Sequence, residues 1–488
     1  MPLCFHLLFY HIRSSFAISY KVKKWFSILA ALTILFSCFS VALAQEDEFI
    51  TVDYQTHFIR WDGVTTDKDF TEESFAALTQ TTVYRSEESP TGYMVTFRFY
   101  GPEYETVEVA GEWYYSEPFY SSQNSAARIH PTQWYNGCMI HTDDVNPVRP
   151  FDQMTLNEDT GYWFYTMPLA SGTYCYQFRL NGKQTISDPQ NLPTEYRGKE
   201  AFSQVLVPYD AEKQSLSPNY ALYQDNCEQR GSIQFAEVPS ATLGYDAPIG
   251  IYLPYGYDAN RAEGYKYVIL GHGIAGFESN WTSQGMLGNI TDNLIAQGLV
   301  EPMIVITPNN RDNEGIYLYS TVNADGSRIT EIDGEPVSNK ETSSNPSYSK
   351  QISQAQPYFM DELIPWLEAH LNVSHEAKDR AFSGLSAGAM CTFNMFISNP
   401  EDFGYFYMMS GANADPTQYD LSRDVLKAPS VTMGVGIYDR LFFSQVNPTQ
   451  TALAANDISF TNYYAFGAHR WHVWRELYID MCTRVLWK

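Results

Sequence analysis

Basic residues are scarce in this sequence. Its 488 residues include 31 lysines and arginines against 56 aspartates and glutamates, which gives a formal net charge of −25. A protein that holds nucleic acid through its phosphates needs a basic surface, so we do not expect nucleic acid as a partner. Hydrophobic residues make up 44% of the chain, which is ample for buried cores, and the length favours two or three domains.

Cysteine is also sparse, with seven residues in the whole chain. The five that follow the N-terminal region are Cys138, Cys175, Cys227, Cys391 and Cys482. They lack the close spacing of zinc ligands, so we expect no metal cofactor. Because five is an odd number, at most two disulfides can form among them.

Long hydrophobic runs are absent after the N-terminal region, so we expect no membrane span in the mature chain. The N-terminal region itself has the layout of a secretory signal, with Lys23-Lys24, an apolar run and the small residues Ala42-Leu43-Ala44. We therefore expect residues 1–44 to be removed and the protein to be secreted or periplasmic. Lipoprotein processing at Cys38 is a weaker alternative to this cleavage. Because the layout of the signal would begin naturally at Val22, this residue is a second candidate for the first translated residue.

Residues 91–192 show the two-residue period of β-strands. Apolar and polar residues alternate over Val95–Phe99 and again over Tyr174–Phe178. The second run precedes Asn181-Gly182, a dipeptide that favours a tight hairpin turn. We expect an all-β, immunoglobulin-like sandwich here, preceded by an N-terminal segment at residues 45–90.

The same region resembles the carbohydrate-binding modules of family 48. The resemblance rests on Gly161-Tyr162-Trp163, Gly172–Phe178, Asn181-Gly182 and Asp188–Asn191, and it implies a module that contacts polysaccharide. Residues 115–150 depart from the family as an insertion. The aromatic residues that are candidates for stacking on sugar rings are Trp113, Trp134, Tyr135 and Trp163. Burial in the core of the sandwich is the alternative for each of them.

The pattern changes after this region. Residues 193–229 contain prolines and polar residues with little periodicity, so we expect a linker. Residues 230–488 contain short apolar runs typical of buried parallel strands, such as Tyr267–Leu270 and Met303–Thr307, with helical stretches between them. This alternation predicts a doubly wound α/β sheet.

Gly384-Leu385-Ser386-Ala387-Gly388 lies between an apolar stretch and a helix-like segment, which is the context of a nucleophile elbow. A serine at such a strand-to-helix turn adopts a strained backbone that small neighbours permit, and its hydroxyl projects above the sheet. Ser386 is therefore the candidate nucleophile. The alternative is a glycine-rich turn without a catalytic role, because the pattern is short enough to arise by chance.

A serine nucleophile needs a base, and the base needs an acid to orient it. On an α/β-hydrolase these residues follow in the order serine, acid, histidine. We prefer His469, which follows the small residues Gly467-Ala468, to His472 as the base. We prefer Asp439, which follows a strand-like run, to Asp457 as the acid. A triad of this kind requires no cofactor.

The tetrahedral intermediate of such a reaction carries an oxyanion that needs hydrogen-bond donors already in place. We expect one donor to be the backbone N–H of Ala387, which follows the nucleophile. The second should come from the glycine-rich loop Leu270–Gly276, with the N–H of Ile274 preferred and that of Gly273 as the alternative. His272 in the same loop is expected to hold the loop in place.

Residues 231–488 closely resemble the esterase D-like α/β-hydrolases of carbohydrate esterase family 1. The segments that carry the resemblance are Leu270–Gly276, Asp292–Ala296, Pro302–Asn309, Asp361–Pro365, Gly384–Gly388, Ser410-Gly411 and Gly467–Trp474. The resemblance implies an α/β-hydrolase fold and an esterase that removes feruloyl or acetyl groups from xylan or arabinoxylan. The long polar excursion over residues 311–350 departs from the family and leaves the acyl group open.

Two other functions stay open on the sequence. One is a siderophore ester hydrolase of the enterochelin type, which also joins a sandwich to this fold. The other is a non-catalytic carbohydrate-binding protein with an inactive esterase fold. Hydrolysis of a catecholate trilactone would identify the first, and xylan binding without release of any acyl product would identify the second.

Overall fold

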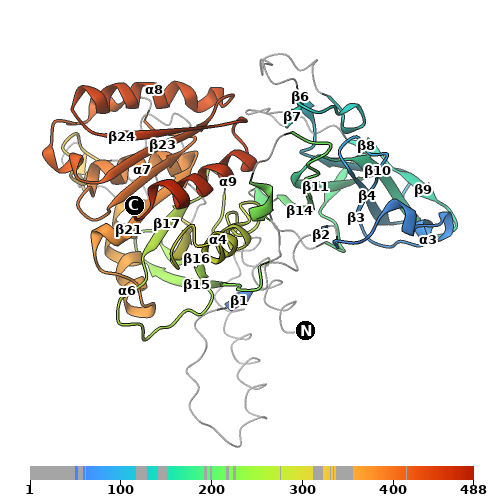
Figure 1. Cartoon of the computed structure of the whole chain (residues 1–488), viewed down its shortest axis with the longest axis horizontal. Coiled ribbons are helices and arrows are strands. Elements are labelled where there is room, and N and C mark those ends of the chain that lie inside the picture. Colours follow the sequence, from blue (N-terminus) through green and yellow to red (C-terminus); the bar gives the residue numbers. More distant parts are fainter. Residues whose placement is uncertain are drawn as a thin grey trace, which may run out of the picture.

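The chain folds into a β-sandwich and an α/β domain that lie side by side (Figure 1). The computed structural model describes residues 50–52, 59–60, 62–116, 129–140, 151–191, 195–197, 200–215, 219–223, 227–274, 276–311, 322–329, 331–332, 335–336, 355–413 and 415–488. The expected export signal lies outside these residues, as do parts of the insertion in the sandwich and most of the polar excursion.

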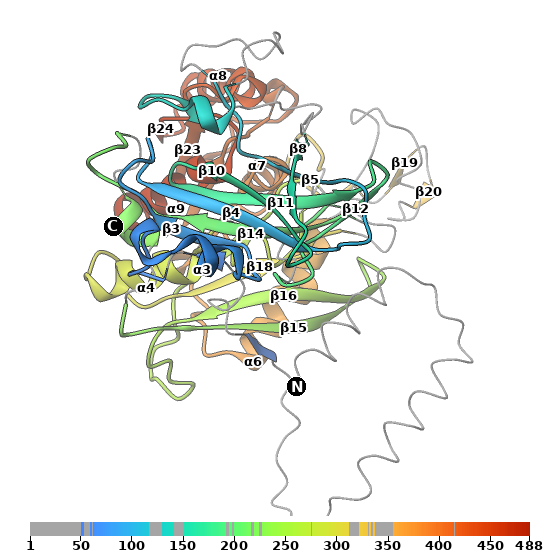
Figure 2. The ribbon, with the colours of Figure 1, turned by 90° about the vertical axis from the view of Figure 1, so that its right-hand side faces the viewer.

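The sandwich consists of two sheets that are antiparallel apart from the parallel pairing of β2 with β14, and Figure 2 views them from the outer side of the sandwich. The smaller sheet has the order β3 (Thr82–Arg85), β4 (Tyr93–Tyr100), β10 (Tyr162–Pro168), β9 (Thr155–Asn157). The larger has the order β13 (Glu195–Arg197), β14 (Glu200–Val207), β11 (Gly172–Leu180), β5 (Val107–Gly111), β8 (Asp152–Gln153), with β12 (Gln184–Ile186) and β2 (Ile59–Arg60) attached. Strands β2, β3, β13 and β14 thus join the sandwich from outside residues 91–192. Nearby lie α3 (Glu72–Ala76) and the hairpin of β6 (Tyr115–Ser116) and β7 (Met139–Ile140).

The predicted alternation in the sandwich is confirmed. Val95, Phe97 and Phe99 of β4 face a core that they share with Tyr176 and Phe178 of β11. The polar residues between them face the other way, so each sheet contributes one apolar face to the common core. The hairpin between β11 and β12 turns where it was expected, with positive φ at Asn181 and Gly182.

The α/β domain is built on a nine-stranded sheet. Its order is β1 (Ile50–Val52), β15 (Ser232–Ser240), β16 (Tyr245–Leu253), β18 (Ile304–Pro308), β17 (Tyr267–Gly271), β21 (Arg380–Leu385), β22 (Tyr405–Met409), β23 (Ser430–Gly436), β24 (Phe460–Ala465). The strands from β18 to β24 are parallel to one another, whereas β15 and β16 are antiparallel to their neighbours. This is the predicted α/β-hydrolase arrangement.

Helices cover both faces of this sheet. One face carries α5 (Ala355–Pro357), a π-helical turn (Tyr358–Leu363), α6 (Ile364–His370), α7 (Ala387–Ser398) and α8 (Arg440–Ala455). The other carries α4 (Leu287–Ala296), α9 (Trp471–Asp480) and a second π-helical turn (Met481–Val485). A short hairpin of β19 (Glu331–Ile332) and β20 (Glu335–Pro336) lies in the excursion. Among the described residues, no helix combines the length and apolar character needed to cross a membrane.

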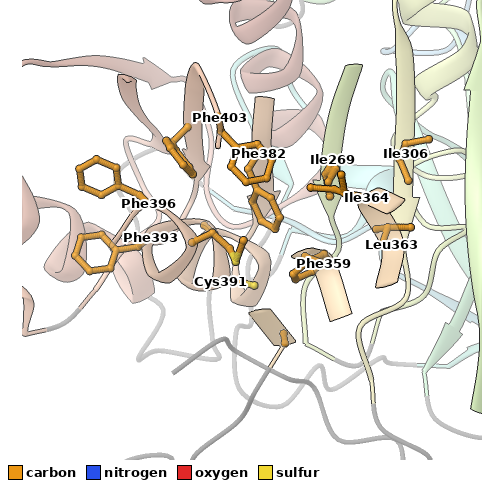
Figure 3. Packing of buried hydrophobic residues seen from close by; sticks show 14 of the residues in the cluster. Ile269, Ile306, Phe359, Leu363, Ile364, Phe382, Cys391, Phe393, Phe396 and Phe403 are labelled. Atoms are coloured by element: carbon orange, nitrogen blue, oxygen red, sulfur yellow. The ribbon is translucent and has the colours of Figure 1, made fainter. Parts of the chain in front are cut away.

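Alternate residues of the central strands supply the two cores. Ile269 and Phe382 pack on the side of α6 and α7, whereas Val268 and Leu270 pack on the side of α4 and α9. Figure 3 shows the first of these cores, in which the ring of Phe382 lies 4.9 Å from that of Phe359. Both faces of these central strands are therefore buried, which explains why their sequences are unbroken apolar runs.

The N-terminal strand connects the two parts of the chain. Residues of β1 pair with β15 at the edge of the α/β sheet, with Ile50 opposite Phe235. The chain then forms the whole sandwich before it returns to the α/β sheet at β15. The sandwich is therefore inserted between two neighbouring strands of the other sheet, a connection that the sequence pattern does not predict.

Candidate active site

Ser386 lies at the tight turn between β21 and α7. Its backbone has φ 54° and ψ −115°, a region that non-glycine residues rarely occupy. The positions two residues before and two residues after Ser386 have room only for glycine. A Cβ on Gly384 would lie 2.7 Å from the backbone of Gly388, and a Cβ on Gly388 would lie 2.7 Å from the carbonyl oxygen of His272. The strained turn therefore presents the serine hydroxyl at the carboxyl end of the central strand.

Three side chains from separate strand ends meet at this turn. The Oγ of Ser386 donates a hydrogen bond of 3.0 Å to Nε2 of His469, and Nδ1 of His469 donates one of 2.8 Å to Oδ2 of Asp439. Asp439 follows β23 and His469 follows β24, so the last two strands at this edge of the sheet supply the acid and the base. The structure therefore brings together the three residues that the sequence singled out, with the imidazole in the tautomer that accepts a proton from the serine.

The carboxylate of Asp439 is fixed on both of its oxygens. Its Oδ1 accepts a hydrogen bond of 3.2 Å from the backbone N–H of Phe442 at the start of α8, which leaves Oδ2 for His469. The residue is only 1% exposed. The N-terminus of α8 therefore holds this buried carboxylate in place through a backbone N–H.

The imidazole of His469 is held on two sides by aromatic rings. The ring of Phe442 stacks on it at 4.6 Å with an interplanar angle of 21°, and the ring of Trp474 meets it edge-on at 4.9 Å. These contacts fix the orientation of the imidazole so that each nitrogen faces its partner. Neither aromatic residue was identified from the sequence, although Trp474 is the last residue of the Gly467–Trp474 segment.

The alternative base and acid lie elsewhere. His472 is turned against Gly467, where burial, with Arg475 and Arg470 nearby, lowers its pKa to about 3. Asp457 is exposed and precedes β24, so it lies at the opposite end of this strand from His469. The structure therefore separates both residues from Ser386.

The two expected oxyanion donors flank the nucleophile. Ala387 is the first residue of α7, so its N–H belongs to the helix N-terminus. Gly273 passes directly beside the serine, because a Cβ on this glycine would lie 3.4 Å from that of Ser386. The side chain of Ile274 is 52% exposed, next to the same position. The loop thus runs beside the nucleophile, and the backbone N–H groups of Gly273, Ile274 and Ala387 stay the candidate oxyanion donors.

His272 holds this loop from within. It is buried, and its Nδ1 donates a hydrogen bond of 2.7 Å to the carbonyl oxygen of Gly273. The indole N–H of Trp281 fixes the preceding residue by a hydrogen bond of 3.0 Å to the carbonyl oxygen of Gly271. Burial lowers the pKa of His272 to about 4, so the imidazole is neutral in the folded protein at neutral pH.

The buried His272 makes stability depend on pH. The unfolded chain binds a proton at this residue near pH 6.5, whereas the folded protein does so only near pH 4. Stability is therefore lost as the pH falls through this window, by about 2 kcal/mol between pH 7 and pH 5. Urea unfolding should show that His272→Gln loses about 2 kcal/mol less than the unaltered chain over this range. Equal losses in both proteins would contradict this origin of the pH dependence.

Gly467 shapes the loop that carries His469. Its φ is 139°, and a Cβ there would lie 2.3 Å from Nε2 of His472 and 2.5 Å from Cγ2 of Val473. Gly467→Ala must therefore shift the loop, and a displacement of about 1 Å at the base costs about 100-fold in rate. We expect the kcat of this variant to fall by that order. Gly298→Ala is the matched control, because Gly298 also has positive φ but has no neighbour within 4 Å. Equal kcat for the two variants would contradict the expectation.

Three of the four aromatic residues considered for sugar binding are buried. Trp113 is fully buried beside Phe97, Trp163 is buried with its indole N–H bonded to the carbonyl oxygen of Gly101, and Trp134 is buried in a small cluster with Tyr115. Their inward positions leave no ring face for a ligand, so the alternative of core packing holds for them. Tyr135 is the exception, because 46% of its surface is exposed.

The sequence analysis missed the aromatic residues on the outer face of the sandwich. Tyr100 and Tyr162 are directly opposite each other on β4 and β10, with their ring centroids 5.1 Å apart. Both occupy the outward phase of the alternation that places Phe99 and Trp163 inside. Tyr100 is exposed and Tyr162 is half-buried, and applying this two-residue phase to the aromatic residues would have distinguished their outward positions from the buried ones.

Metal binding and disulfides have little support in the described part of the chain. It contains no group of three or more histidine, cysteine, aspartate or glutamate side chains arranged to hold a metal ion. None of the five cysteines from Cys138 to Cys482 forms a disulfide within this part.

Comparison with known proteins identifies the family. Residues 240–485, half of the chain, match the family described as "Putative esterase". The chain belongs to this esterase family. A relative from Xylanibacter ruminicola named endo-1,4-beta-xylanase/feruloyl esterase is 28% identical over 326 residues, which cover 65% of this esterase and 39% of the relative. The chain therefore spans well under half the length of that relative.

Solved esterase structures also match the chain. A ferulic acid esterase from Anaeromyces mucronatus is 16% identical, with a TM-score of 0.42, and the match covers 54% of this chain and 92% of the other. The enterobactin esterase of Shigella flexneri is 14% identical, with a TM-score of 0.49, over 85% of this chain and 98% of the other.

Proposed function

We propose that this esterase hydrolyses carboxylic esters through an acyl intermediate on Ser386. The observation that carries the proposal is the position of His469, which is within hydrogen-bond distance of both Ser386 and Asp439. A serine hydroxyl is a weak nucleophile until a base removes its proton, and this arrangement supplies the base already oriented. Membership of the esterase family supports the same reaction class.

The first half of the reaction forms the acyl-enzyme. The Oγ of Ser386 attacks the ester carbonyl carbon while Nε2 of His469 takes the hydroxyl proton, and Asp439 stabilises the imidazolium without taking its proton. The carbonyl oxygen becomes an oxyanion between the N–H of Ala387 and those of the Gly273–Ile274 loop. Each such donor contributes about 2.7–4 kcal/mol to the transition state. Collapse of the intermediate breaks the ester bond, and His469 returns the proton to the leaving alcohol.

The second half repeats these steps with water. His469 takes a proton from a water molecule, whose oxygen attacks the carbonyl carbon of the acyl-serine. A second oxyanion forms between the same donors. Its collapse releases the carboxylic acid and returns the proton to Ser386 Oγ, so the enzyme is regenerated. These steps need only groups of this chain and water, without a cofactor.

We propose feruloyl or acetyl esters on xylan or arabinoxylan as the substrate. The resemblance of residues 231–488 to carbohydrate esterase family 1 supports this class, as does the named xylanase/feruloyl esterase relative. The resemblance of the sandwich to family 48 modules fits a polysaccharide partner, with Tyr135 the exposed member of the original aromatic set. A substrate of this kind is polymeric and extracellular, which agrees with the export signal expected at residues 1–44.

Release of acyl groups from defined substrates tests this proposal. Purified protein is incubated with feruloylated arabinoxylan, acetylated xylan and a catecholate trilactone in parallel, and ferulate, acetate and catecholate products are separated by chromatography. We expect ferulate or acetate release that is absent from Ser386→Ala. Selective hydrolysis of the trilactone would contradict the xylan substrate in favour of the siderophore alternative. Xylan binding without any acyl product would contradict catalysis itself.

A further inference from the structure

The sandwich contacts the two segments that position the catalytic groups. Arg475 lies in α9, the helix that begins two residues after His469. Its guanidinium donates hydrogen bonds through Nη1 to Oγ1 of Thr173 in β11, at 3.0 Å, and to the carbonyl oxygen of Gln284, at 2.7 Å. Figures 1 and 2 show α9 beside the sheet that contains β11 and β14. The side chain of Arg475 therefore connects three parts of the protein: the sandwich, the segment around Gln284, and the helix that follows His469.

This guanidinium is enclosed by protein. Arg475 is 2% exposed, and its Cζ lies 5.0 Å from the ring centroid of Tyr223 in the connecting segment. The neighbouring Glu476 accepts hydrogen bonds from the side chains of Tyr223 and Asn219 in the same segment. Burying a cation costs much free energy, and the two hydrogen bonds of Nη1 offset part of this cost, so their loss would be unfavourable. Such a contact fixes the position of α9 relative to the sandwich.

From Gln284 the connection continues to the oxyanion loop. Gln284 belongs to a tightly turned segment in which the backbone N–H of Leu287 is bonded to the carbonyl oxygen of Trp281 at 3.0 Å. The indole of Trp281 in turn donates to the carbonyl oxygen of Gly271, two residues before Gly273. The side chain of Gln284 also meets the sandwich directly, since the Sγ of Cys175 lies 3.5 Å from its Oε1.

From Trp281 a second series of contacts leads to the base through aromatic rings. The ring of Trp281 meets that of Trp471 edge-on at 5.2 Å, and Trp471 meets Trp474 at 5.1 Å. Trp474 then meets His469 at 4.9 Å. Trp471 and Trp474 lie in the first turn of α9, the helix whose next turn carries Arg475. The same helix therefore holds the imidazole at one point and the sandwich at another.

We propose that Arg475 is a positioning residue. Its bond to Thr173 anchors α9 to strand β11 of the sandwich, and this anchor keeps the oxyanion loop and His469 in their positions relative to Ser386. The sandwich is then part of the catalytic scaffold as well as a candidate polysaccharide module. This inference rests on the proposed function, because it assigns the contact a role in the reaction at Ser386. Insertion of the sandwich between β1 and β15 fits this role, since it ties both ends of the sandwich to the α/β sheet.

Substitutions in the full-length protein test the inference. Thr173→Val removes the hydroxyl with little change in shape. Arg475→Lys keeps the charge but shortens the side chain by one atom, so its ammonium cannot occupy the position from which Nη1 bonds both acceptors. We expect each to lower kcat about tenfold with little change in KM, because a small displacement of catalytic groups affects the transition state more than binding. We expect the same loss in the rate at which diethyl p-nitrophenyl phosphate labels Ser386. Thr173→Ser, which keeps the hydroxyl, should retain the original rates.

Matched controls separate positioning from general destabilisation. Thr166→Val removes a hydroxyl bonded at 2.8 Å to Oγ1 of Thr96 within the sandwich, and Arg484→Lys alters an arginine bonded to Asp480 far along the same helical run. Both controls should keep the original kcat and labelling rate even where circular dichroism shows a lower Tm. Original rates in Thr173→Val and Arg475→Lys would overturn the inference alone. A wild-type protein that the reagent does not label would overturn the proposed function, and the inference with it.

Discussion

Ser386→Ala is expected to lower kcat by about a million-fold, because removal of the nucleophile disables the whole triad at once. The residual rate then comes from the oxyanion donors and substrate binding, which the substitution leaves in place. The hydroxyl of Ser386 is bonded only through the 3.0 Å contact to His469 among the contacts described above, so its loss should change the fold little. Steady-state ester hydrolysis measures the effect, and circular dichroism confirms that the variant is folded.

Ser398→Ala is the matched control for this variant. Ser398 lies at the other end of α7, and its hydroxyl is bonded to the carbonyl oxygen of Met395 in the same helix. The same atoms are therefore removed from the same helix without touching the site, and kcat should be unchanged. Comparable activity in Ser386→Ala and the unaltered protein would show that another residue attacks the ester.

Asp439→Asn is expected to lower kcat by about ten-thousand-fold. The amide that replaces the carboxylate can donate a hydrogen bond to Nδ1 of His469, which favours the tautomer with the proton on Nε2. That tautomer cannot accept the proton of Ser386. Because the amide can still accept the N–H of Phe442 at the start of α8, the geometry should be preserved. Pre-steady-state kinetics should show that acylation and deacylation are both slowed, because His469 takes a proton in each half of the reaction.

Asp457→Asn is the control that distinguishes the two acids considered from the sequence. Asp457 is exposed at the opposite end of β24, so its substitution should leave kcat unchanged. The reverse pattern, with a large loss in Asp457→Asn and little in Asp439→Asn, would require a different arrangement of the loops in solution. Comparison of kcat between Asp439→Asn and Asp457→Asn therefore tests which aspartate is the catalytic acid.

The sequence predicts the candidate triad well because its signals are local. An elbow serine needs small residues at fixed positions, and the structure shows that Gly384 and Gly388 have no room for a Cβ. The acid and base follow the carboxyl ends of strands that the apolar runs already indicate, and in a parallel sheet these ends lie along one edge. Chain order then restricts the candidates to a few residues, of which Asp439 and His469 meet at Ser386.

Exposed aromatic residues, which are the candidates for stacking on sugars, are harder to predict because residue type alone does not indicate burial. Trp163 occupies the inward phase of β10 and is buried, whereas Tyr100 occupies the outward phase of β4 and is exposed. Trp113 is buried although it follows the end of β5 and belongs to no strand. A change of register by one residue reverses this assignment for the whole strand. The correct phase becomes clear only when the apolar neighbours of each aromatic residue are considered together.

Contacts between distant segments are the part that sequence reasoning could not reach. The pairing of β1 with β15 joins residues on either side of the whole sandwich, and no local pattern in Ile50–Val52 specifies that partner. The bond between Arg475 and Thr173 is similar, since an arginine within a helix is usually a solvent-exposed residue. Both contacts depend on how complete domains pack, which is decided by their folded surfaces rather than by periodicity.

Covalent labelling of the nucleophile tests the central claim most directly. The purified protein is treated with diethyl p-nitrophenyl phosphate, digested, and analysed by mass spectrometry to locate the phosphoryl adduct. The account predicts one adduct, on Ser386, formed in parallel with loss of ester hydrolysis and absent from Ser386→Ala. Complete inactivation with an adduct on another residue, or ester hydrolysis that persists while Ser386 is fully labelled, would contradict it.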